Sequence, residues 1–147
     1  MKRYFFALFL LGVVSVISIA GYFFSQSNSV EEVVLGNALE KFDLIRVSIP
    51  ESNDVVESPL RIEGKARGGW FFEASFPVRA VDQNGNILGA GIAQAQGDWM
   101  TEEFVPFQME LEFKTPETKQ GAILFVKDNP SGLPEHDDEL RVPIRFK

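Results

Sequence analysis

The sequence predicts an all-β domain, a two-sheet sandwich of about seven short strands, which follows an apolar N-terminal segment. Three observations support this prediction. From residue 44 onward, apolar and polar side chains alternate with a period of two, which is the period of a half-buried strand. Gly, Pro, Asn and Asp separate the alternating stretches, as turn residues do. None of these stretches has the 3.6-residue apolar period of a helix.

The N-terminal segment predicts a membrane anchor. Residues 4–24 read YFFALFLLGVVSVISIAGYFF and contain no charged side chain. As a helix, this run would extend roughly 32 Å and match a hydrocarbon core of about 30 Å. Because Lys2 and Arg3 precede it, the positive-inside rule places the N-terminus in the cytoplasm. We therefore expect residues 1–24 to be a single-pass anchor in the cytoplasmic membrane, with the C-terminal domain outside it.

A cleaved signal peptide is the alternative. Ser18-Ile19-Ala20 has the small-x-small form that a signal peptidase accepts, and cleavage there would release a secreted soluble domain. Against cleavage, Gly21 to Phe24 prolong the apolar run beyond this point.

Residues 25–43 are expected to form a linker or stalk. Ser25 to Ser29 is a polar spacer, and the following VEEVVLGNALEKF places apolar residues near helical spacing, with Ser29 in position to cap a helix. Gly36-Asn37 weakens a helix here, so a short stalk helix and an irregular linker both stay open.

The strands of the predicted domain, residues 44–147, follow from the alternation. Phe107, Met109, Leu111 and Phe113 alternate with polar residues and should face the core. Pro143 has no N–H to donate, so its strand should lie at an edge or carry it at an unpaired position. The expected strands cover residues 45–49, 60–66, 70–80, 87–95, 107–114, 122–128 and 140–146.

Asn84-Gly85 predicts a tight hairpin between the third and fourth strands. A two-residue type I′ turn needs positive φ at both central positions, which Asn tolerates and Gly accepts freely. Beyond the turn, Gly89, Ala90 and Gly91 predict a bulge or a closely approaching backbone. Seven short strands in about 100 residues favour the immunoglobulin topology. Because the chain has no cysteine, the core would be stabilised by its Phe-rich faces alone.

Charge excludes one class of partner. Lys2 and Arg3 are the only charged side chains before Glu31, so the remaining 14 − 2 = 12 basic side chains stand against all 21 acidic ones. A surface this acidic repels phosphate backbones, and nucleic acid is therefore not expected as a partner. The lack of cysteine also excludes a thiolate metal site and a cysteine nucleophile.

Trp70 and Trp99 are the candidate binding residues. Both follow closely after a Gly at the boundary of a strand or loop, and together on the surface they would stack on a cell-wall glycan or a partner protein. The alternative is that these rings pack in the core of the sandwich.

No catalytic residue, cofactor or metal is predicted. His136 is the only histidine and lies among acidic residues in a loop, with no nucleophilic serine elbow to serve. The same loop offers oxygen ligands that would suit calcium, but their spacing is not that of an EF-hand. These ligands are Asp128, Asn129, Glu135, Asp137 and Asp138.

Four stretches within residues 44–147 carry a family resemblance through their order and spacing. They read IRVSIPESNDVVESPLRIEGKAR, WFFEASFPVRAVDQNGNILGAGIAQAQG, PFQMELEF and AILFVKDNPSGLPEHDDELRVPIRF. Together they resemble the immunoglobulin-like domain of bacterial spore germination, the GerM-associated domain family. The resemblance implies an all-β, immunoglobulin-like envelope module without a catalytic motif. No second domain precedes the sandwich here, so the fold carries over rather than a role in germination.

We therefore expect a non-enzymatic module displayed outside the cytoplasmic membrane. Its partners would be an envelope protein or a cell-wall glycan, or it would support an envelope assembly. The alternatives are the secreted domain and, from another class, a hydrolase of envelope polymers, for which the sequence offers no nucleophile–base pair.

Overall fold

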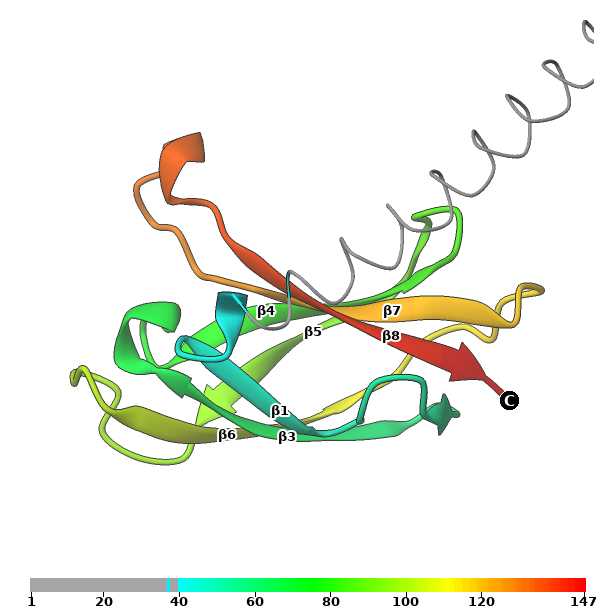
Figure 1. Ribbon diagram of the computed structural model, residues 1–147, viewed down its shortest axis with the longest axis horizontal. Helices are drawn as coiled ribbons and strands as arrows, with labels where there is room; N and C mark the ends of the chain where they lie inside the picture. Colours follow the sequence, from blue (N-terminus) through cyan, green and yellow to red (C-terminus); the bar gives the residue numbers. More distant parts are fainter. Residues whose placement is uncertain (1–36, 38–39) are drawn as a thin grey trace, which may run out of the picture. The chain divides into compact units, whose positions relative to one another are not determined.

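The computed structural model describes residue 37 and residues 40–147, and it shows an all-β arrangement (Figure 1). Eight strands form one continuous, curled sheet in the order β1-β3-β6-β5-β4-β7-β8-β2. Seven of them correspond to the expected segments, and β2 is additional. Their bounds are β1 (Ile45–Ile49), β2 (Val55–Val56), β3 (Leu60–Arg67), β4 (Ser75–Asp82), β5 (Ile87–Ala95), β6 (Phe104–Leu111), β7 (Gln120–Val126) and β8 (Glu139–Phe146).

The sheet curls into two layers at β5. This strand pairs with β4 from Ser75↔Gln94 to Val81↔Ile87, but with β6 only at Gln94↔Gln108 and Ala95↔Phe107. One layer contains β1, β3 and β6, and the other contains β4, β7 and β8 (Figure 1). The order β1-β3-β6-β5 followed by β4-β7-β8 corresponds to the ABED and CFG sheets of an immunoglobulin domain. The fold is therefore consistent with the immunoglobulin topology, although the β4–β5 ladder joins the two expected sheets into one.

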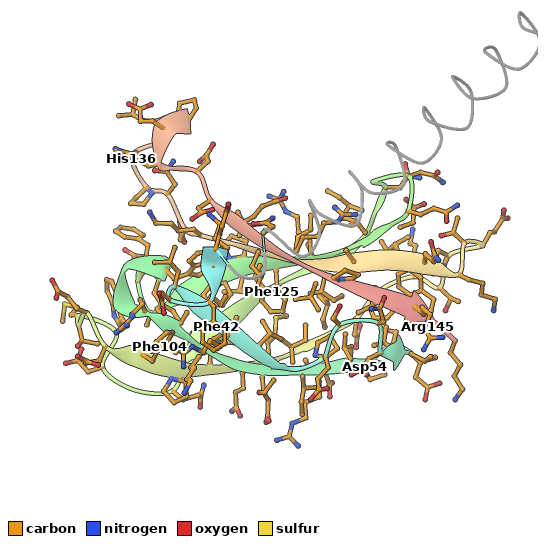
Figure 2. The ribbon with its side chains drawn as sticks, viewed as in Figure 1. Phe42, Asp54, Phe104, Phe125, His136 and Arg145 are labelled. Atoms are coloured by element: carbon orange, nitrogen blue, oxygen red, sulfur yellow. The ribbon has the colours of Figure 1, made fainter. Side chains whose placement is uncertain are left out.

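Phenylalanine rings connect the two layers across the core. Phe76 of β4 and Phe107 of β6 meet edge to face with 4.9 Å between ring centroids, and Phe125 of β7 follows 6.0 Å from Phe107. Figure 2 shows Phe125 in the interior. The expected inward faces are confirmed, because Phe107 and Leu111 are buried while Met109 and Phe113 pack against the core.

The prediction of a long strand that begins near Trp70 is wrong. The chain instead forms a short 3₁₀ helix, η1 (Gly68–Trp70), and β4 starts only at Ser75. Between them, Phe72 and Ser75 exchange two backbone hydrogen bonds, of 3.0 and 3.1 Å, around Glu73 and Ala74. Both central residues have positive φ, 48° and 63°, which is the geometry of a type I′ turn. The alternation continues through Phe72, Ala74 and Phe76, so the pattern concealed this turn.

The prediction of a type I′ turn at Asn84-Gly85 is also wrong. Of the two residues, only Gly85 has positive φ, 83°. The N–H of Gly85 donates to the carbonyl of Asp82, and the N–H of Asp82 donates to the carbonyl of Asn86, each at 3.0 Å. These bonds enclose a three-residue loop with a left-handed glycine at its end. The loop is one residue longer than expected, and the Asp82 side chain accepts hydrogen bonds from the backbone N–H groups of Asn84 and Asn86 within it.

The bulge predicted after this hairpin is confirmed. The β4–β5 register shifts between Ala80↔Gly89 and Val81↔Ile87, so Leu88 is the extra residue. A backbone also approaches closely, because a Cβ added to Gly89 would overlap the carbonyl oxygen of Glu112.

The N-terminal predictions lie mostly outside the described residues. This holds for the membrane span at 4–24, the cleavage point after Ala20 and most of the stalk. Within the stalk, Asn37, Glu40 and Lys41 are helical. Over residue 37 and residues 40–147, no helix has the length and apolar character needed to cross a membrane.

Candidate functional site

A hollow of about 420 Å³ lies beside the short β5–β6 ladder. Five of its six lining residues have polar side chains, although apolar atoms make up more of its accessible surface, and we call it the polar hollow. The residues come from β3, from the end of β5 and from β6: Arg61, Gln94, Gln96, Gln108, Met109 and Glu110.

Strand alternation and register place these side chains together. Gln94 of β5 is directly opposite Gln108 of β6, and Arg61 of β3 is directly opposite Glu110 of β6. Residues that alternate with them are buried, as Ala93 is, or half-buried, as Met109 is, so the glutamines project from the outer face. The β5–β6 ladder contains two residue pairs, and beyond them the two backbones next meet where the Lys114 N–H donates to the Leu88 carbonyl at 3.1 Å. The hollow therefore lies beside a gap in the pairing of the two strands.

Met109 supplies the apolar part of the lining. It points the opposite way from Gln108 and packs against the core. Gly91 on β5 makes room for it, because a Cβ there would lie only 2.6 Å from Met109 Cε. The polar hollow therefore combines amide groups with one thioether side chain.

Most polar atoms of the hollow are available to a ligand. Arg61 Nε donates to Glu63 Oε1 at 2.8 Å, and Gln96 Nε2 donates to the carbonyl of Gln94 at 3.1 Å. Within the described part of the chain, Arg61 and Gln96 are the lining residues whose side chains make a hydrogen bond. Because Glu63 balances the charge of Arg61, the remaining amides dominate the chemistry of the hollow.

A second surface feature is a cluster of cations around one ring, which we call the Phe104 cluster. The guanidinium carbons of Arg46 and Arg67 lie 4.4 and 4.2 Å from the ring centroid of Phe104, and Lys65 Nζ lies 5.6 Å from it. Arg46 also stacks on Phe42, at 4.0 Å, and Figure 2 shows the two phenylalanines on the same side of the domain. These contacts join β1, β3 and β6.

The two arginines of the Phe104 cluster already have polar partners. Arg67 Nε donates to the carbonyl of Asp43 and its Nη1 to the carbonyl of Glu102. Carboxylates approach both arginines, Asp43 at 3.9 Å from Arg46 and Glu103 at 3.8 Å from Arg67. We therefore infer that the Phe104 cluster stabilises the packing of β1, β3 and β6.

The two tryptophans lie close to each other in the fold but not on the surface together. Trp70 is 2% exposed, and its backbone carbonyl accepts a hydrogen bond from Asp128. Trp99 is half-buried and packs against the core. The two segments meet at Gly68, where a Cβ would overlap the carbonyl oxygen of Trp99. Trp70 is therefore packed in the core, and ligand binding by Trp70 and Trp99 stays a prediction.

The acidic loop between β7 and β8 projects from the body of the domain. His136 is exposed at its tip in the 3₁₀ helix η2 (Pro134–His136) (Figure 2). Asn129 Nδ2 donates to Asp137 Oδ1 at 2.7 Å, and Lys41 pairs with Asp138 at 2.5 Å. Among the residues that the structure describes, no three His, Cys, Asp or Glu side chains are grouped to hold a metal ion.

Sequence reasoning missed the polar hollow. The alternation correctly placed Gln108 and Glu110 on an outer face, and Gln94 and Gln96 show the same spacing. No local pattern indicates that β5 pairs with β6 at only two positions, or that residues of β3 meet these glutamines there.

Comparison with known proteins gives one match. A family model described as the immunoglobulin-like domain of bacterial spore germination matches residues 44–132, which is more than half of the chain. No curated protein and no solved structure matches the chain.

Proposed function

Because the chain belongs to the family of the immunoglobulin-like domain of bacterial spore germination, we propose that it is a non-enzymatic binding module displayed outside the cytoplasmic membrane. Membership of this family supports the statement that the chain is an immunoglobulin-like module. The envelope location and the binding activity are the parts that we add.

The polar hollow is the observation that carries the binding activity. The hollow is shallow and open to solvent, and its volume of about 420 Å³ gives room for a small ligand. Several polar side chains converge there without partners in the described part of the chain. Converging polar groups in a concave site are what fixes the orientation of a ligand.

The lining of the hollow favours binding over catalysis. It contains no Ser, Thr, Lys or His that would act as a nucleophile or a base, and a single carboxylate, Glu110. Glycoside hydrolysis generally uses a pair of carboxylates across the scissile bond. The only histidine, His136, does not line the hollow and is exposed at the tip of the β7–β8 loop.

The apolar run at residues 4–24 supports display outside the membrane, because Lys2 and Arg3 precede it. The lack of cysteine allows a direct test with single-cysteine variants. Glu135→Cys places a thiol on the exposed β7–β8 loop, and a cysteine inserted after Met1 is the matched control. We expect a membrane-impermeant maleimide to label Glu135→Cys on intact protoplasts, and the control only after lysis. Labelling of Glu135→Cys only after lysis would contradict display outside the membrane.

Photo-crosslinking tests the binding activity itself. A photoreactive residue at position 108 lies in the polar hollow, whereas one at Gln120 of β7 is exposed but does not line it. In whole cells we expect a crosslinked product from position 108 that position 120 does not give. The proposed binding activity fails if the two positions give the same products or none.

A further inference from the structure

We propose that the polar hollow binds a neutral, hydroxyl-rich glycan. This inference rests on the proposed binding function and names the ligand class of the same site. It follows from the hydrogen-bonding groups, the charge and the shape of the lining.

The hydrogen-bonding groups match hydroxyls. Each glutamine amide offers one acceptor oxygen and two N–H donors. Gln94, Gln96 and Gln108 therefore present donors and acceptors side by side in one hollow. A sugar hydroxyl is likewise both donor and acceptor, so one hydroxyl can satisfy an amide oxygen and an amide N–H at once.

The charge of the lining disfavours ionic ligands. Arg61 is the only cation of the lining, and it is already bound to Glu63. Glu110 adds a negative charge, which repels anionic ligands such as phosphate or uronate polymers. A cationic ligand would in turn be repelled by Arg61, which lines the hollow together with this single carboxylate. An uncharged ligand avoids both penalties.

The shape of the hollow suits a sugar ring. The hollow is open to solvent, so an extended chain can pass across it. The exposed Ile92 lies two residues along β5 from Gln94, on the same face of the strand, and provides an apolar surface for the C–H face of a ring.

Nuclear magnetic resonance titration of the full-length chain tests the inference. The chain is held in dodecylphosphocholine micelles, because glycoside detergents would compete for the hollow. The probes are β-1,4-linked tetraoses of glucose and of N-acetylglucosamine. We expect at least one probe to shift the side-chain amide signals of Gln94, Gln96 and Gln108, while the signal of Gln120 stays in place.

Two matched variants connect the signal to the site. We expect Gln108→Ala to weaken binding about 3- to 10-fold, the effect of losing one or two hydrogen bonds. Gln120→Ala should leave the affinity unchanged. Equal thermal unfolding of both variants would show that the loss is local. Because the ligand is uncharged, raising the salt concentration should not weaken binding.

Parallel titrations with an extended peptide and with polyglutamate separate failure of this inference from failure of the proposed function. If either of these shifts the three glutamine signals and no tetraose does, the glycan inference is overturned and the binding activity stands. If position 108 gives no crosslinked product in cells, the binding activity itself fails.

Discussion

Asn86 donates hydrogen bonds to both carboxylate oxygens of Asp82, from its backbone N–H to Oδ1 at 2.9 Å and from its side-chain amide to Oδ2 at 2.8 Å. Asn84 adds a third, from its N–H to Oδ1 at 2.8 Å. Asp82 is 6% exposed and is the one charged side chain among the buried described residues. The carboxylate therefore organises the β4–β5 loop by taking the N–H groups that the turn leaves free.

These bonds predict a pH-dependent stability. The hydrogen bond from the Asn86 side chain, helped by the backbone bonds from Asn86 and Asn84, lowers the pKa of Asp82 below its ordinary 3.8, although burial acts in the opposite direction. A lowered folded-state pKa stabilises the fold above pH 3.8, and this contribution is lost as the pH falls through the folded pKa. We expect urea unfolding to show the wild type more stable than Asp82→Asn at pH 6, with the gap closing below about pH 4. A gap that stays constant down to pH 2 would contradict this account.

The turn at Glu73-Ala74 predicts a stabilising substitution. Both residues hold positive φ without being Gly or Asn, which is unfavourable by about 1–2 kcal/mol per residue. Glu73→Asn with Ala74→Gly should raise the free energy of unfolding by about 1–2 kcal/mol, because Asn-Gly is the preferred type I′ pair. The opposite kind of change, from glycine to a residue with a Cβ at a position of positive φ, serves as the control. Gly85→Ala should lower it by about 1 kcal/mol, since Gly85 has φ 83° with open space around it. Urea denaturation measures both, and a loss of stability in the double variant would refute the turn assignment.

The Phe104 cluster predicts unequal effects of two similar substitutions. Phe104→Leu keeps an apolar side chain but removes the ring that three cations share, and each contact at an exposed site contributes about 0.5–1 kcal/mol. We expect it to lower the free energy of unfolding by about 1–2 kcal/mol. Phe42→Leu removes a ring that one cation of the described residues, Arg46, stacks on, and its effect should be smaller. Equal losses by chemical denaturation would exclude a stabilising role for the shared cations.

Leu111→Asp should abolish cooperative unfolding. Leu111 is 1% exposed, so the substitution buries an unpaired carboxylate at a cost of several kcal/mol, against a total stability of about 5–15 kcal/mol. Glu112→Ala, one residue away and exposed, should stay within about 0.5 kcal/mol of the parent. Calorimetry distinguishes the two. Parent-like melting of Leu111→Asp would mean that the strand register is wrong.

Fluorescence quenching tests the positions of the tryptophans. Trp99→Phe leaves only Trp70, whose ring is buried, so iodide should not quench its emission. Trp70→Phe leaves the half-buried Trp99, which iodide should quench in part. Strong quenching of Trp70 would place its ring on the surface and favour the stacking interpretation.

The alternation of apolar and polar residues predicted the strands well where no turn or 3₁₀ helix interrupts them. The expected strand at 87–95 has the same bounds as β5, and Leu140, Val142, Ile144 and Phe146 of β8 are all buried as expected. Pro143 also lies as predicted, because β2 pairs with β8 only at Arg145 and Phe146. These features depend on the side-chain period of one strand, which the sequence displays directly.

Features that depend on distant partners could not be predicted. Only two residues long, β2 is held by bonds such as that from the Arg145 N–H to the Asp54 carbonyl, 2.8 Å, between residues that Figure 2 shows together. The turn at Glu73-Ala74 was hidden because neither residue is a typical turn former.

The amino-acid order by itself determined which side chains face inward and which face solvent, because that pattern is a local property of each strand. Only the tertiary structure decided that β5 pairs with β4 at seven positions but with β6 at two, and the polar hollow lies beside this short ladder. The reason is that strand partnership depends on burying faces from segments far apart in the chain, and no local pattern encodes the point where two strands part.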